Sequence, residues 1–152
     1  MSHRLRRRLK DERGFTLIEL LVVILIIGIL AGIAIPSFLS QTGKAYDASA
    51  KELAHTAEIT AETYATDHGG SFAGMETKNL QEYEGTLKSC PNGSSSCFVE
   101  SKPEEGGKGY SVETEAYKTK DKFVIKRNEK AEYSRECKSE TNGCQGGKSS
   151  SW

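Results

Sequence analysis

The sequence predicts an α+β protein in which a long N-terminal helix packs against a small antiparallel β-sheet that disulfides staple. Three observations predict this fold: an apolar run near the N-terminus, an alanine-rich stripe with helical spacing, and short alternating segments separated by turns in the C-terminal half. The chain has 152 residues, with 21 basic and 21 acidic side chains. That length leaves room for one domain after the apolar run.

The apolar run is long enough to cross a membrane. No charged residue lies between Leu20 and Ile35, and the run extends back to Phe15 with two interruptions, a threonine and Glu19. Such a helix spans about 31 Å, which matches the roughly 30 Å of bilayer hydrocarbon. The preceding residues, 1–14, carry six basic and two acidic side chains. The positive-inside rule therefore predicts a cytoplasmic N-terminus and export of everything after Pro36.

Two ordinary interpretations of this N-terminus leave one residue unexplained. A secretory signal peptide would be cut near Gly32 and Ala34, but its apolar core is usually roughly 7 to 15 residues long, shorter than this run. A permanent signal anchor fits the length. Neither accounts for Glu19, whose charge costs roughly 2.5 to 3.5 kcal/mol at the centre of a bilayer.

The segment RGFTLIELLVVILIIGILAGIAIPSF, residues 13–38, resembles the N-terminus of type IV pilins and of the related secretion pseudopilins. The resemblance implies that residues 1–14 are a leader. A prepilin peptidase in the membrane would cut it on the cytoplasmic side between Gly14 and Phe15, and the new amine of Phe15 would be methylated. Residues 15–42 would then form the membrane and assembly helix.

The resemblance also implies a role for Glu19. It would neutralise the Phe15 amine of a neighbouring subunit as that subunit docks into a filament, because a buried charge without its partner costs about 3 to 5 kcal/mol. A simpler explanation stays open. After cleavage Glu19 lies one helical turn from Phe15 on the same face, where it faces the positive end of the helix dipole, worth about 0.3 to 1 kcal/mol.

Two glycines and a proline mark the C-terminal half of the run. Gly28 and Gly32 have the small-xxx-small spacing that lets helices approach closely in lipid, although glycine is also common in membrane helices. Pro36 lacks a backbone donor and is expected to kink the continuing helix. By resemblance, the interval from Gly28 to Pro36 is where related helices lose helical order inside a fibre.

Residues 43–152 are expected to form an exported head, beginning with an amphipathic helix at about 43–66. Its apolar stripe follows the helical period and consists of Ala50, Leu53, Ala54, Ala57, Ala61, Tyr64 and Ala65. The sequence DHGG at 67–70 predicts where the helix ends. His55 and His68 have no companion ligands nearby in sequence, so we expect surface histidines and no metal site.

The rest of the head is predicted to be a loop at 67–97, with a short helical turn at 78–83, followed by a sheet at about 98–137. Strands are expected at 98–100, 110–117, 122–126 and 132–136. Tyr110, Val112 and Thr114 are expected to share one face, and Phe123 and Ile125 another. Short links between the strands favour antiparallel hairpins that rest on the alanine-rich stripe.

Four cysteines form two C-x6-C units in the head, and zinc pairs usually show the shorter C-x2–4-C spacing. An exported head lies in an oxidising compartment, so disulfides are expected. Of the three possible connectivities we favour the local pairs, Cys90–Cys97 and Cys137–Cys144, each worth about 2 to 3 kcal/mol. The second pair would close a C-terminal loop at 137–152, as is common among pilins.

The sequence contains no catalytic triad, phosphate-binding glycine motif or cluster of metal carboxylates, so we expect neither an enzyme nor a cofactor. Residues 15–152 hold 15 basic and 19 acidic side chains, which argues against a general nucleic-acid binder. An enzyme tethered by a signal anchor is the main alternative from another functional class.

The resemblance implies a structural subunit of a type IV pilus: a precursor in the cytoplasmic membrane that becomes part of a surface filament. Its expected partners are its own copies, the membrane, prepilin peptidase and the pilus assembly machinery. A secretion pseudopilin is the alternative, although residues 134–152 lack the clustered aspartates with which some pseudopilins bind calcium. Major and minor pilins stay open, as do motility, adhesion, DNA uptake and electron transfer.

Overall fold

The structure, a computed structural model, describes residues 14–90, 93–139, 144 and 149–152. The chain divides into two compact units between Leu39 and Ser40, and we call residues 40–152 the head. The helix α1 (Leu17–Asp67) contributes to both units. The other elements all belong to the head: α2 (Thr77–Tyr83), β1 (Ser96–Pro103), β2 (Tyr110–Ala116), β3 (Lys122–Arg127), β4 (Tyr133–Lys138) and β5 (Ser149–Ser150).

The five strands form one sheet in sequence order, and every neighbouring pair is antiparallel. The short links predicted this arrangement for the β2–β3 and β3–β4 hairpins. In the β2–β3 ladder, Val112 pairs with Ile125 and Thr114 pairs with Phe123. Side chains of directly paired residues point to the same side of a sheet. The two sets that we expected on separate faces therefore share a single face.

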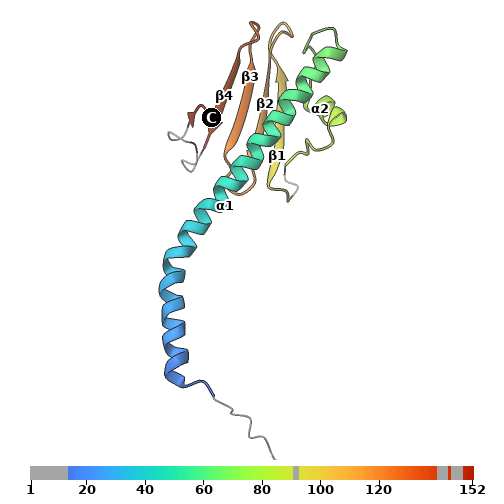
Figure 1. The fold of residues 1–152 in the computed structure, drawn as a ribbon. Coiled ribbons are helices and arrows are strands. Elements are labelled where there is room, and N and C mark those ends of the chain that lie inside the picture. The colour runs from blue at the N-terminus through green and yellow to red at the C-terminus, as the bar shows by residue number, and fades with distance from the viewer. Residues whose placement is uncertain (1–13, 91–92, 140–143, 145–148) are drawn as a thin grey trace, which may run out of the picture. The chain divides into compact units, whose positions relative to one another are not determined.

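The head half of α1 lies across this face of the sheet (Figure 1), and the predicted alanine-rich stripe is its buried side. Ala50, Ala54, Ala57 and Ala61 are fully buried, whereas Ile59, which is off the stripe, is 68% exposed. Small side chains let a helix and a sheet approach closely. The predicted α+β fold, with a helix packed on an antiparallel sheet, is confirmed.

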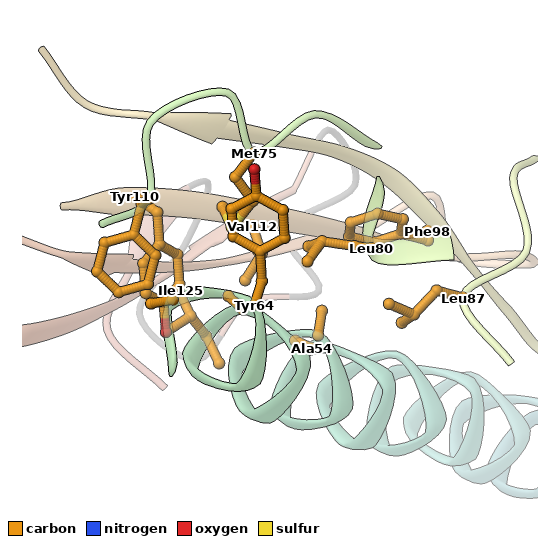
Figure 2. Packing of buried hydrophobic residues seen from close by; sticks show 13 residues of the cluster. Ala54, Tyr64, Met75, Leu80, Leu87, Phe98, Tyr110, Val112 and Ile125 are labelled. Atoms are coloured by element: carbon orange, nitrogen blue, oxygen red, sulfur yellow. The ribbon is translucent and has the colours of Figure 1, made fainter. Parts of the chain in front are cut away.

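Larger side chains fill the space around the alanines. Figure 2 shows Ala54 and Tyr64 projecting from α1 toward side chains that come from α2, its flanking loops and the strands. The largest fully buried members of this cluster are Phe72, Met75, Leu80, Leu87, Phe98, Tyr110, Val112 and Ile125. Two buried hydroxyls of β2 join the two layers: Thr114 donates to the carbonyl of Ala50 at 2.8 Å, and Tyr110 donates to the carbonyl of Glu58 at 3.4 Å.

The predicted boundaries are wrong at two places. β1 begins at Ser96, inside the segment expected to be a loop, and runs to Pro103 at its exposed end, which an edge strand tolerates because its outer N–H groups need no partner strand. β5 lies inside the segment expected to be only a loop and pairs with the end of β4. The helical turn predicted near residue 80 is present as α2, which the side chains of Glu76 and Asn79 cap reciprocally.

Candidate functional site

The amino end of α1 is closed by a reciprocal pair of side chains. Gly14 and Phe15 precede the helix, and Phe15 is 89% exposed. The Thr16 hydroxyl donates to Glu19 Oε2 at 2.7 Å, and the Thr16 backbone N–H donates to the same oxygen at 2.9 Å. In return, the Glu19 N–H donates to the Thr16 hydroxyl at 3.3 Å. This arrangement is a capping box, which satisfies backbone donors that a helix start leaves unpaired.

Sequence reasoning missed Thr16, although the signal was present. A threonine followed three residues later by glutamate, at the start of an apolar run, is the pattern of a capping box. The structure thus gives Glu19 a local role that differs in detail from the expected interaction with the helix dipole. Its carboxylate is held by named donors in its own chain, which partly offsets the cost of placing a charge beside an apolar segment.

The first half of α1 exposes a continuous apolar surface. It is the single helix in the described part of the chain that is long and apolar enough to cross a membrane. Between Leu17 and Leu39 the exposed fractions of the large apolar side chains range from 44% at Val22 to 80% at Leu17. A surface of this size needs lipid or other helices to cover it.

In the described part of the chain, the space beside the two glycines of this segment is open. A Cβ atom added at Gly28 or at Gly32 would meet no atom within 4 Å. Gly28 contributes to a shallow apolar depression on the helix, together with Leu21, Ile24, Leu25 and Ile29. No intramolecular contact therefore requires these glycines, and packing against another helix stays a prediction.

Pro36 lies inside α1, which continues to Asp67. Because proline has no N–H, the carbonyl of Gly32, four residues earlier, loses the donor that a regular helix would supply. The backbone is thus weakened at the place where the resemblance predicts a loss of helical order.

Two disulfides close short loops in the head. Cys90 is joined to Cys97 and Cys137 to Cys144, with Cα atoms 5.2 Å and 5.8 Å apart. These are the two local pairs favoured from the sequence. The second bridge lies beside the last pairing of the sheet, since Cys137 is also the ladder partner of Ser150.

Among the described residues, the single group with the geometry of potential metal ligands consists of Cys90, Cys97 and Glu115. Its two sulfur atoms are bonded to each other and are therefore not available as thiolates. The two described histidines are exposed and make contacts with residues of α1. His55 Nδ1 lies 3.0 Å from Glu58 Oε2, and His68 Nδ1 lies 2.8 Å from the carbonyl oxygen of Tyr64.

These features define a class of protein: a helix with a capped amino end that is able to cross a membrane, followed by a disulfide-bonded α+β head. Comparison with known proteins refines the class. Residues 9–35 match the family described as "Prokaryotic N-terminal methylation motif". The "Type IV major pilin protein PilE1" of Neisseria gonorrhoeae is 41% identical over 58 residues, which cover 38% of this chain and 35% of that protein.

Two further relatives extend the comparison. The "ComG operon protein 3 homolog" of Bacillus licheniformis is 32% identical over 83 residues, which cover 55% of this chain and 86% of that protein. The "Type IV major pilin protein PilA" of Myxococcus xanthus is 55% identical over 40 residues, covering 26% of this chain and 18% of that protein. The chain belongs to the type IV pilin family. No solved structure matches it significantly.

Proposed function

We propose that the chain is a structural subunit of a type IV pilus and has no catalytic activity. The observation that carries the proposal is the match of residues 9–35 to the N-terminal methylation motif, together with the likeness of the chain to major pilins. The structure exposes a long apolar helix surface over the described part of that segment. The chain matches only about a third of the length of the gonococcal pilin, 35%, so the likeness does not reach most of the head. An apolar helix bundle at the centre of a fibre would cover the exposed surface.

Processing is the first step of the proposed function. The bond between Gly14 and Phe15 lies outside the helix, which begins at Leu17, so its backbone is not tied into helical hydrogen bonds. Such a bond is a suitable substrate for a peptidase. Cleavage there removes the basic leader and creates an amine at Phe15, the proposed site of methylation. The match of residues 9–35 to a family described by its N-terminal methylation motif supports this step.

Assembly then depends on Glu19. Both bonds from Thr16 end on Oε2 of the carboxylate. The other oxygen, Oε1, is left to accept the Phe15 amine of a neighbouring copy, so the capping box and the intersubunit contact are compatible. In a low-dielectric fibre core, the amine without this partner would cost about 3 to 5 kcal/mol.

The proposed location of the chain changes from the cytoplasmic membrane, before assembly, to the cell surface, after assembly. The precursor lies in the cytoplasmic membrane with the basic N-terminus inside, and the assembled copies form a surface filament. Prepilin peptidase and the pilus assembly machinery act on the precursor. Gly28, Gly32 and Pro36 let the apolar helices pack closely and yield locally as they are drawn into the fibre.

The test compares Glu19→Ala with Glu52→Ala, an exposed glutamate of the same helix in the head. Membrane-bound and sheared surface fractions are measured by immunoblot, with leader cleavage followed in parallel. We expect Glu19→Ala to be inserted and cleaved but scarce in the sheared fraction, and Glu52→Ala to behave as the parent. Normal filament yield from cleaved Glu19→Ala would refute the intersubunit role. Absence of filaments containing the parent chain would instead favour a pseudopilin.

A further inference from the structure

Two turns at opposite ends of the sheet differ in exposed charge. The β2–β3 turn, residues 117–121, exposes Lys118 and Lys120, while its acidic residue, Asp121, is fully buried and accepts a hydrogen bond from the Ser139 hydroxyl. At the opposite end of β3, the β3–β4 turn, residues 128–132, exposes two glutamates and one lysine, Lys130. Among the described residues, one turn is therefore basic and the next is acidic.

The basic turn lies against the beginning of the head helix. The Thr119 hydroxyl donates to Asp47 Oδ1 at 2.5 Å, and the Lys118 ammonium lies 6.0 Å from the centre of the Tyr46 ring. The turn and α1 pack closely at Gly43, where an added Cβ would lie 3.3 Å from the Thr119 methyl group. Figure 1 shows this turn at the end of the sheet where α1 enters the head.

A third lysine and a second tyrosine complete the surface. Lys44 is exposed on α1 one residue after Gly43, and Tyr117 is 44% exposed. We call Lys44, Tyr46, Tyr117, Lys118 and Lys120 the basic rim. Lys120 also pairs with Glu115 at 2.9 Å, but its side chain keeps 57% of its surface exposed.

The position of the basic rim along the helix matches the depth of lipid headgroups. Lys44 follows Leu39, an exposed apolar residue of the first unit, by five positions, which is about 7.5 Å along a helix axis. The headgroup layer extends roughly 5 to 8 Å beyond the hydrocarbon on each side of a bilayer. The exposed apolar surface continues past Ile35 to Leu39, so a span from Leu20 to Leu39, about 30 Å of helix, fills the hydrocarbon as well as one that begins at Phe15. A helix in that position would carry Lys44 at the level of the phosphates.

We propose that the basic rim binds anionic phospholipid headgroups while the subunit waits in the membrane. This inference rests on the proposed function, because only a membrane-anchored precursor brings the rim to a bilayer. Lysines near an anionic surface each strengthen attachment by about fivefold, and tyrosines favour the membrane interface. The contact would hold the head against the membrane and would be lost when the subunit is extracted into a fibre.

The experiment uses the full chain in vesicles of phosphatidylcholine alone or of phosphatidylcholine mixed with phosphatidylglycerol. A water-soluble amine-reactive ester labels the lysines, and mass spectrometry gives the rate at each position. On the anionic vesicles we expect labelling of Lys118 to slow by about fivefold, and added sodium chloride to restore it. Lys130, in the turn at the other end of the sheet, is the internal control and should label equally in both.

A variant pair gives an independent readout. Hydrogen exchange of the turn amides at 117–121 should be slower on anionic vesicles in the parent chain and in Lys130→Gln, but not in the double variant Lys118→Gln and Lys120→Gln. Equal labelling of Lys118 in both lipids, in chains that resist carbonate extraction, would overturn the inference and leave the pilin proposal intact. Protection that disappears when the chain is diluted in the bilayer would assign the rim to a second copy and also overturn it. Failure to insert would instead contradict the proposed function.

Discussion

The Thr16 hydroxyl lies 2.7 Å from Glu19 Oε2, so the charged side chain of the apolar segment is held within the first turn of its own helix. The glutamate has two tasks in our proposal: it caps α1 through one oxygen and receives a neighbour's amine through the other. The cap also fixes the direction of the carboxylate before that amine arrives. Thr16 is then a positioning residue for assembly.

Replacing Thr16 tests whether the cap of α1 contributes to the role of Glu19 in assembly. Thr16→Val removes the hydroxyl and should destabilise the first turn by about 1 kcal/mol, whereas Thr16→Ser keeps the cap. We expect faster hydrogen exchange at residues 17–20 and a lower sheared filament yield for Thr16→Val only. Equal exchange and yield in the two variants would mean that the cap contributes nothing to assembly.

Processing predicts a defined N-terminus. Intact-mass measurement of the surface form should give a chain that begins at Phe15 and carries one methyl group. An N-terminus at Ile35 would instead favour the interpretation of the apolar run as an ordinary secretory signal peptide. An uncut chain in the surface fraction would contradict the role proposed for the Phe15 amine.

The C-terminal bridge should contribute to the stability of the head. Non-reduced peptide mapping is expected to find Cys137 joined to Cys144 and Cys90 joined to Cys97. Replacing both Cys137 and Cys144 by serine should lower the free energy of unfolding by about 2 to 3 kcal/mol, measured by denaturant titration in detergent. Crossed pairs in the map would contradict the predicted connectivity. Four free thiols would contradict the prediction that disulfides stabilise the head.

Asp47 gives a prediction for pH. Partial burial raises the pKa of its carboxyl above the ordinary value of 3.8, and the nearby Asp121 adds to this, against the opposing hydrogen bond from Thr119 and the charge of Lys51. The folded chain therefore keeps a proton that the unfolded chain has already released. This contribution to stability is complete below the unfolded pKa and is lost as pH rises through the folded pKa.

Asp47→Asn keeps an acceptor for Thr119 and removes the titration. The variant should match the parent in melting temperature at low pH and exceed it as pH rises past that window, with Glu52→Gln as an exposed control. Because other carboxylates also titrate, the comparison uses the difference between the two melting curves at each pH. A difference that does not change with pH would contradict the prediction.

The spacing of apolar residues in the sequence predicted which face of the helix is buried. The stripe from Ala50 to Ala65 is buried, apart from the partly buried Leu53, because a helix has one covered face, and the sequence alone identifies that face. The shared face of Val112 and Ile125 was mispredicted, because register depends on which residues pair across strands and not on either strand alone. β5 was missed because two residues carry no periodic signal.

The outer face of the sheet carries a consequence for how fibres of this protein would meet. Lysines and glutamates alternate across its strands: Lys122 lies 2.9 Å from Glu113, and Lys126 lies 2.7 Å from Glu136. Each charge is balanced by its neighbour, so two such faces brought together would repel each other only weakly. If this face points outward in a fibre, lateral bundling of neighbouring fibres would be governed by the fit of their surfaces and would change little with ionic strength.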